Sequence, residues 1–394
     1  MEEIKKDWRD IFRAFRMAFD PKKLILGFVG VVSTFFVVAI LAGIFNRLGF
    51  ISSTPKSLIN DLFFTSNLCP YELLLVFCKS MTPFSVGRFI ALTTLLMSIL
   101  VIWSVIGGAI TRIAAVEYAK DESVRLIEAV KFSLKRFWSY FCSPIVPVIG
   151  VIFFALCNVL GGLVGKLGVF GDIFVAIGFP LALLSSFMIT FIGVLGIIGL
   201  CLMFPTISAE GSDAFDAMSR AYSYVLSKPK KYFTYFFLST IYGIVCIMFV
   251  GLLACLVVNI TFDTVSVGMG QKFKDITEAV RINPGYCSLV GVSAHDFRAG
   301  LGTLANWPEK FVALSILLSL IAIKTLVFGF GLAYVGSAKT IVYFLMRKDV
   351  DETEITDVYI EEEIDTSEKK TEDKKGDDTS NTDNSGAKDD VHQS

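Results

Sequence analysis

A lysine within a long apolar segment is the residue of this sequence best suited to a chemical role. Lys324 lies near the middle of Phe311–Leu332, and a charge at the centre of a bilayer costs about 2.5–3.5 kcal/mol on insertion scales. We therefore expect it to face a helix bundle or a wet cavity and to contact a solute or an ion. The alternative is a shifted helix whose lysine extends to the membrane interface. No apolar segment offers an acidic partner at similar depth, which argues against a proton relay.

Glycines recur at every third position in another apolar segment. They are Gly193, Gly196 and Gly199. Small residues allow helices in lipid to approach closely, so we expect these glycines to mark helix packing. The alternative is a hinge or a broken helix that lines a transport path. Paired broken helices in corresponding halves of the chain would favour transport, and the sequence does not contain them.

The sequence offers little for catalysis. Of its 2 histidines, His392 lies in the tail and His295 has no second histidine nearby to share a metal. The phosphate-binding glycine loop and the Gly-x-Ser-x-Gly nucleophile motif are absent. Four neighbouring acidic residues are flanked by bases, and we expect them to lie on a solvated helix face. They are Glu117, Asp121, Glu122 and Glu128. We expect no enzyme activity, no cofactor and no metal.

The composition indicates that membrane helices position these residues. The chain has 394 residues, of which 54% are hydrophobic and 19% charged, whereas a soluble domain has about 25% charged residues. A helix needs about 20 apolar residues to cross a bilayer, and six segments meet this condition. They are Leu24–Phe45, Phe89–Ile113, Ile145–Val164, Ile173–Phe204, Tyr235–Ile260 and Phe311–Leu332. The expected fold is all-α, a polytopic helical membrane protein whose transmembrane domain covers residues 24–348. The fourth segment contains Gly178 and Pro180, which predict a kink or a short lead-in helix.

The distribution of charge predicts the orientation. Lysine and arginine gather in residues 1–23, 114–144, 205–234 and 347–348, which are alternate connections and therefore lie on one side. The positive-inside rule makes that side the cytoplasm, so both termini are expected there. The basic residues are placed to meet lipid, and we expect no binding to nucleic acid.

Three cysteines fall in the two long loops that this orientation places outside the cytoplasm. Cys69 and Cys78 lie in the loop 46–88, and Cys287 lies in the loop 261–310. One alternative is a disulfide with one thiol left over, for which Cys69 and Cys78 are the simplest pair. The other alternative is that all three remain thiols.

A similar element precedes three of the apolar segments. An amphipathic helix, which at the start of the chain covers residues 1–23, leads into paired bases, then aromatic residues, then the span. Such helices lie at the headgroup boundary, where bases meet anionic lipid and aromatic rings sit at the interface. The expected lipid contacts are Arg9, Arg13, Arg16, Lys22, Lys23, Lys135, Arg136, Trp138, Lys230, Lys231 and Tyr232. Either the chain is built from three helix–span repeats, or common interfacial chemistry imitates a repeat.

The last 46 residues, 349–394, differ from the rest. They contain 17 acidic and 5 basic residues, a net charge of −12, whereas the preceding residues carry 20 acidic and 31 basic residues, a net charge of +11. From Thr366 onward the composition is mostly charged and small polar residues, which cannot bury a core, so we expect a disordered cytoplasmic tail. The tail either solvates the chain or docks onto a cytoplasmic protein or onto the basic helices.

Several stretches resemble a known group of proteins. Ser337–Asp351, Asp357–Glu361 and the region from Ala209–Gly211 to Tyr232–Phe233 are similar to uncharacterised multi-pass membrane proteins of planctomycete-type bacteria. The resemblance covers about the last two-thirds of the chain. It implies a location in the bacterial inner membrane, but no activity and no functional residues.

Two functions fit these observations. The first is a membrane-organising or partner-binding component without catalytic activity. The second is a small transporter or channel with a path near Lys324 and the glycine-rich fourth and sixth spans.

Overall fold

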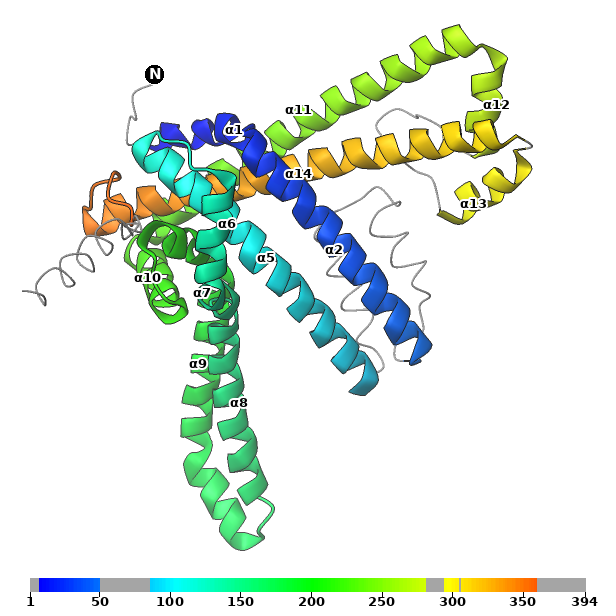
Figure 1. Cartoon of the computed structure of the whole chain (residues 1–394). Coiled ribbons are helices and arrows are strands. Elements are labelled where there is room, and N and C mark those ends of the chain that lie inside the picture. Colours follow the sequence, from blue (N-terminus) through cyan, green and yellow to red (C-terminus); the bar gives the residue numbers. More distant parts are fainter. Residues whose placement is uncertain (1–6, 50–85, 281–293, 305, 360–394) are drawn as a thin grey trace, which may run out of the picture. The chain divides into compact units, whose positions relative to one another are not determined.

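The computed structural model describes residues 7–49, 86–280, 294–304 and 306–359, and their regular structure is entirely helical (Figure 1). The chain divides into two units, Met1–Val358 and Tyr359–Ser394, and of the second unit only Tyr359 is described. The architecture described here is that of the first unit.

Within the described residues, six helices are long and apolar enough to cross a membrane, which confirms the predicted fold class. They are α2 (Pro21–Arg47), α5 (Val86–Lys120), α8 (Ile145–Val164), α9 (Val169–Glu210), α11 (Pro229–Met269) and α14 (Trp307–Asp351). Each contains one of the six predicted segments. Hydrocarbon provides no partners for backbone N–H and C=O groups, so a spanning segment must satisfy them within its own helix.

Several of these helices are longer than a bilayer requires. Helices α9, α11 and α14 contain 42, 41 and 45 residues, whereas a crossing needs about 20. Helix α9 continues through Pro180, so of the two alternatives predicted there, a kink or a short lead-in helix, the separate lead-in helix does not form. Each of these helices therefore continues without interruption beyond the span, where it can contact other elements.

Short helices precede three of the long ones, as the sequence predicts. They are η1 (Trp8–Phe12), α1 (Arg13–Ala18), α6 (Leu126–Lys135), α7 (Phe137–Cys142) and α10 (Ala214–Ser227). Asp20 caps α2 by accepting a hydrogen bond from the Lys22 N–H at 3.0 Å, and Asp213 caps α10 by accepting one from the Asp216 N–H at 2.8 Å. Two further helices, α12 (Gln271–Ala279) and α13 (Ala294–Thr303), lie between α11 and α14 in the chain.

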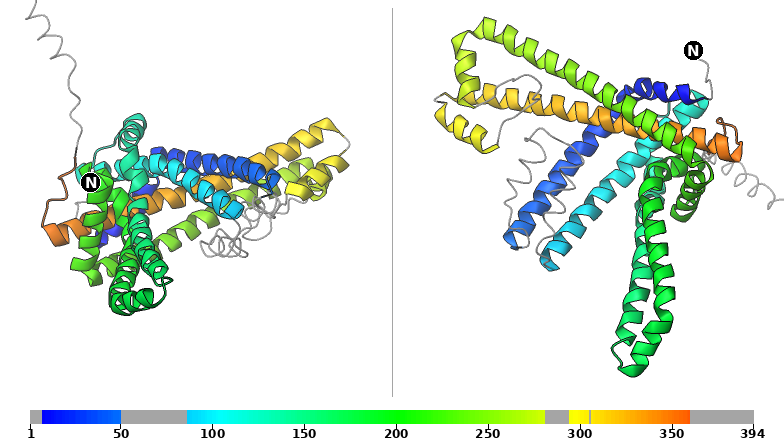
Figure 2. Two further views of the ribbon diagram at one scale, coloured as in Figure 1. Left: turned by 90° about the horizontal axis from the view of Figure 1, so that it is seen from below. Right: turned by 180° about the vertical axis from the view of Figure 1, so that it is seen from behind.

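The long helices pair in the order in which they follow one another. Helix α2 packs on α5, α8 on α9 and α11 on α14, so that each pair forms a helical hairpin (Figure 2). Helix α2 also packs along α14, which connects the first hairpin to the last.

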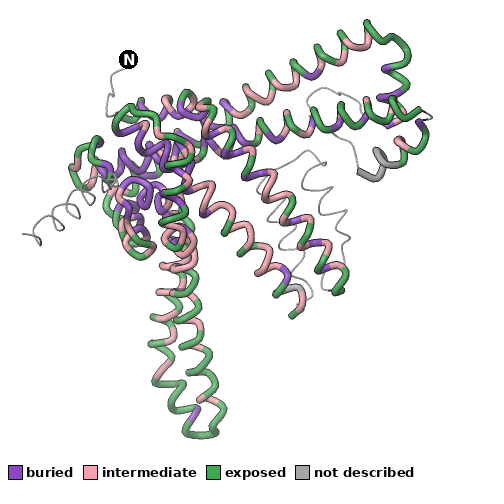
Figure 3. Tube along the Cα trace, in the orientation of Figure 1, coloured by how far each residue is buried: buried purple, intermediate pink, exposed green. Residues whose placement is uncertain are grey.

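Burial is concentrated where the short helices meet the adjoining ends of the long helices (Figure 3). We call this region the junction. Its main hydrophobic cluster draws residues from η1, α1, α5, α9, α10, α11 and α14. By contrast, most side chains of the hairpins away from the junction are exposed or half-buried. The junction is therefore the part of the chain that holds the hairpins together.

The first unit continues past the end of the predicted transmembrane domain. Sequence analysis placed the start of the tail at Asp349, but Ile355 and Val358 are buried, with 2% and 7% of their surface exposed. These side chains join the hydrophobic cluster of the junction. Residues 360–394, to which the prediction of disorder mainly applies, lie outside the described residues.

Glycines allow α2 and α14 to approach each other closely. A Cβ added at Gly27 would lie 2.6 Å from the carbonyl oxygen of Gly329, and one at Gly329 would lie 2.9 Å from the backbone nitrogen of Phe28. Both neighbours are backbone atoms, which cannot rotate away as a side chain does. The two helices therefore pack in the way that small residues permit in lipid.

Gly27→Ala is expected to destabilise the protein by about 1–3 kcal/mol, because the added methyl group must push two backbones apart. The matched control is Gly43→Ala, also on α2, where an added Cβ meets nothing within 4 Å. The measurement is the thermal unfolding midpoint of each purified variant in detergent. Equal midpoints for the two variants would contradict the close approach.

Candidate functional site

A buried lysine at the start of α2 is held by three other parts of the junction. The Lys23 side chain is fully buried, and its Nζ lies 2.5 Å from Oε2 of Glu117 on α5. It also donates to the Met17 carbonyl at 3.0 Å and to Oγ of Ser337 on α14 at 3.3 Å. This ammonium group therefore connects α2 with α1, α5 and α14.

A second charge, largely buried, lies at the end of α9. The carboxylate of Glu210 accepts a hydrogen bond from the Tyr343 hydroxyl at 2.5 Å and lies 3.4 Å from Nε of Arg347, both on α14. On its other side, Nη1 of Arg220 on α10 lies 2.9 Å away. Arg220 loses some solvation, which lowers its pKa, but Glu210 and Asp216 outweigh this effect and raise the pKa above its ordinary value. Glu210 thus connects α9, α10 and α14.

Polar groups from α5, α7 and α9 also meet in the junction. Nη1 of Arg112 donates to the Ser208 carbonyl at 2.7 Å, and its guanidinium lies 4.1 Å from the ring centroid of Phe132. Oγ of Ser208 is 2.6 Å from Oγ1 of Thr111 and 2.8 Å from the Tyr140 hydroxyl. Burial raises the pKa of the Tyr140 hydroxyl above its ordinary value.

Aspartates at the end of α14 contact the elements that follow α9. Oδ1 of Asp349 lies 2.8 Å from Nζ of Lys231, and its Oδ2 accepts from the Tyr235 hydroxyl at 3.0 Å. Asp351 accepts a hydrogen bond from the Tyr224 hydroxyl at 2.5 Å. Burial raises the pKa of Tyr224, and Asp351 raises it further. The acidic segment begins as part of the junction.

The segment after α14 is held by the same arginine that contacts Glu210. Nη1 of Arg347 donates to the Asp357 carbonyl at 2.6 Å, and Nη2 lies 3.1 Å from the Asp357 carboxylate. The Arg347 side chain is only 9% exposed, so its charge depends on these partners for compensation. Among the described residues, no group of three or more His, Cys, Asp or Glu side chains could hold a metal. The arrangement is suited to holding helices together.

Most of the bases expected to contact lipid are accessible. Exposed side chains among the described ones are Arg9, Arg16, Lys135, Trp138, Lys230 and Lys231. On α6, Ile127 and Leu134 point outward, 78% and 57% exposed, as side chains covered by lipid would, whereas Val130 is half-buried against a core cluster. Three other bases, Arg13, Lys22 and Arg136, are half-buried. Arg13 lies 3.5 Å from Asp121, and Lys22 donates a hydrogen bond to the Val124 carbonyl.

The structure differs from the prediction at two of these positions. Lys23 is fully buried against Glu117, so it contacts protein instead of lipid. Tyr232 is 1% exposed and its hydroxyl donates to the Ile198 carbonyl at 2.7 Å. In both cases the residue directly follows a more exposed lysine and faces inward, because the helix turns by 100° at each residue.

The glycines of α9 differ in their surroundings. An added Cβ at Gly196 would lie 2.9 Å from Pro147, and one at Gly199 would lie 3.3 Å from Tyr222, whereas one at Gly193 would lie 3.9 Å from Val151. Gly196 and Gly199 thus allow α8 and α10 to approach α9.

The other candidates have separate locations. Lys324 is half-buried on α14, next to the buried Thr325. Cys69, Cys78 and Cys287 lie outside the described residues. The candidate residues that the structure describes therefore do not come together at one point.

Sequence reasoning missed the buried charges of the junction. Glu117 was expected on a solvated face, and no role was assigned to Glu210, Arg347 or Arg112. A signal was available, because Glu117 and Glu210 both lie at the end of a long apolar segment and just before an amphipathic helix.

Comparison with family models, with curated proteins and with solved structures found no match to this chain.

Glu210→Gln is expected to lower the free energy of unfolding by about 3 kcal/mol, because it removes the largely buried carboxylate beside Arg347 and leaves that arginine only the more exposed Asp357. The control is Glu128→Gln, which removes a carboxylate from an exposed pair with Arg125 and should cost less than about 1 kcal/mol. Chemical unfolding in detergent measures both changes. A Glu210→Gln variant as stable as the control would show that the charge cluster does not hold the junction.

Proposed function

We propose that this protein is a non-catalytic, multi-pass component of a bacterial inner membrane, with both termini in the cytoplasm. In this proposal it organises the membrane or binds partner proteins. Its amphipathic helices contact anionic lipid. Partner proteins contact the acidic tail and the exposed sides of the hairpins away from the junction, which we call the flanks. The resemblance of Ser337–Asp351 to bacterial multi-pass proteins supports the location.

The exposure of the spans is the observation that carries this proposal. Only 6% of the most apolar window of α8 is buried within the protein, and the corresponding value for α5 is 11%. Large side chains such as Phe153 on α8 and Phe187 on α9 remain 59% and 60% exposed. Surfaces of this kind are covered by lipid or by other membrane proteins. A solute path would instead require spans that enclose a polar space between them.

Charge supports a cytoplasmic partner of the tail. Residues 349–394 carry a net charge of −12, while Asp349, Asp351 and Asp357 are already held in the junction. Further acidic residues follow this held segment in the sequence. A basic surface on a cytoplasmic protein would complement them.

Photo-crosslinking tests the proposed role of the flanks. With a photoreactive phenylalanine analogue at Phe153 or Phe187, we expect adducts with other polypeptides in native membranes. The matched control is Phe330, which is 2% exposed and should give none. Truncation after Tyr359, which keeps the junction intact, should reduce adduct yield severalfold if the tail recruits the partner. Adducts formed with lipid alone at both flank positions would contradict partner binding.

A small transporter is the second candidate, and the half-buried Lys324 on α14 favours it. If solute passes this lysine, Lys324→Met and Lys324→Gln should each reduce flux at least tenfold in reconstituted vesicles while leaving the unfolding midpoint unchanged. The control is Lys310→Gln, at the start of the same helix. Unchanged flux in both Lys324 variants would exclude transport through this residue.

A further inference from the structure

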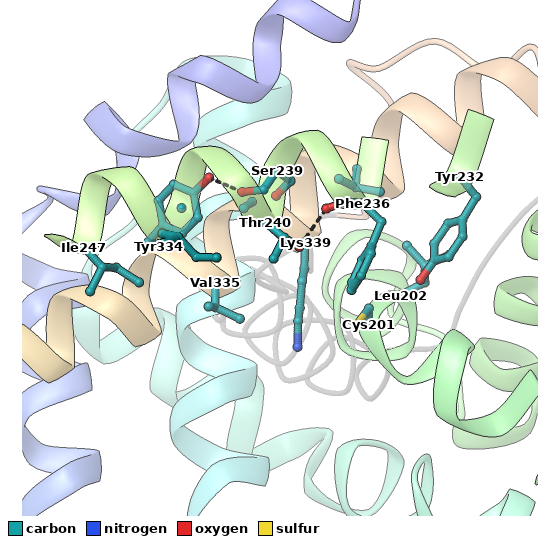
Figure 4. A pocket seen from close by; sticks show the side chains of 14 residues that line it. Cys201, Leu202, Tyr232, Phe236, Ser239, Thr240, Ile247, Tyr334, Val335 and Lys339 are labelled. Carbon is teal, nitrogen blue, oxygen red and sulfur yellow. Dashed lines mark hydrogen bonds between the residues drawn. The ribbon is translucent and has the colours of Figure 1, made fainter. Parts of the chain in front are cut away.

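A cavity opens between three of the long helices beside the junction. It has a volume of about 180 Å³ and is lined by α9, α11 and α14. Figure 4 shows the Lys339 side chain extending from α14 between Val335 and Phe236. The rest of the lining is almost entirely apolar or aromatic. The lining residues are Cys201, Leu202, Tyr232, Phe236, Ser239, Thr240, Gly243, Ile244, Ile247, Tyr334, Val335, Ala338, Lys339 and Val342.

Lys339 differs from the bases around the junction. Lys23 and Lys231 each form an ion pair, and Lys228 donates to the Asp349 carbonyl. Lys339 forms no hydrogen bond or ion pair with any residue in the described part of the chain, although it is half-buried. A charge that is partly removed from water is stabilised by an opposite charge beside it, so Lys339 is available to an anion from outside the chain.

Two polar residues of the lining lie outside the predicted spans. Lys339 follows the predicted end of the last span at Leu332, and Tyr232 precedes the predicted start of the fifth span at Tyr235. Both residues therefore lie at headgroup depth on the side of the junction. Beyond Ser239 and Thr240, the lining residues of α11 are Gly243, Ile244 and Ile247, which carry no polar side chain and lie within the predicted span.

On α11 the lining extends over a length similar to the thickness of one leaflet. From Tyr232 to Ile247 the helix rises by about 22 Å at 1.5 Å per residue. One leaflet, including its headgroups, is about 20–22 Å thick. A molecule that fills this lining needs an anionic group at one end and hydrocarbon along the rest of its length.

We infer that the cavity is a binding site for one anionic phospholipid from the leaflet beside the junction. Its phosphate lies at Nζ of Lys339, and an acyl chain lies along Phe236, Ile244 and Val335. The site requires only that the hairpins lie in a bilayer, so it holds whether or not the protein binds partners. Basic pockets between spans on the cytoplasmic side are known to bind anionic headgroups.

Native mass spectrometry of the full-length protein tests this site. The protein is purified in detergent and titrated with phosphatidylglycerol or with the zwitterionic phosphatidylethanolamine. We expect one phosphatidylglycerol to be retained about fivefold more tightly than phosphatidylethanolamine, the preference that one lysine near a lipid surface supplies.

Three variants separate the charge from the cavity. Lys339→Met should remove the fivefold preference, whereas Lys339→Arg should keep it. Lys230→Met, which removes an exposed base on the same side of the protein, should leave the preference unchanged. Val335→Trp, which fills the cavity without changing charge, should reduce retention of both lipids.

Several results would overturn the inference. One is a Lys339→Met variant whose preference equals that of Lys230→Met. Another is Val335→Trp retaining both lipids as the wild type does. Displacement of phosphatidylglycerol by millimolar inorganic phosphate would indicate a site for free anions instead of lipid. The unfolding midpoint of each variant confirms that a loss of lipid does not follow from a loss of fold.

Discussion

Charged groups are costly in hydrocarbon, and a chain that crosses the membrane repeatedly must collect them where its helices leave the bilayer. In this protein the collected charges do more than interact with water. Lys23 and Glu210 are both largely buried, and each contacts groups from several helices. The arrangement of the hairpins therefore depends on these two compensated charges. Removing one partner would leave the other charge buried, which is why breaking such a pair costs more than the pair itself contributes.

The spans themselves are held together in a different way. In lipid there is no hydrophobic driving force between apolar helices, so close packing depends on shape. The glycines at positions 27 and 329 let α2 and α14 approach until their backbones are in contact. Gly196 likewise allows Pro147 to pack against α9. Elsewhere the hairpins leave their apolar side chains exposed. Polar contacts hold the hairpins together at one end, and only a few positions along the spans are closely packed. Long surfaces of the spans therefore remain that lipid or other proteins can cover.

The same principle explains why Lys339 is distinctive. Most bases near the junction either face outward or have a partner within the protein, as Lys231 has in Asp349. Lys339 extends into an apolar cavity between α9, α11 and α14. A group that combines a negative charge with hydrocarbon satisfies both parts of this environment. The lipid proposed for the cavity would thus act as an additional component of the junction.

The sequence by itself determined that the chain is all-helical, with six apolar segments and an amphipathic helix before three of them. Those features follow from local composition and periodicity, because hydrocarbon permits few ways to satisfy a backbone. Only the tertiary structure decided which charges are buried. Glu117 appeared to belong to a solvated face, yet it lies against Lys23, 94 residues earlier in the chain. Likewise, Asp357 appeared to belong to a tail, yet it is held by Arg347. Contacts of this kind depend on how helices distant in sequence meet, and no local pattern records that.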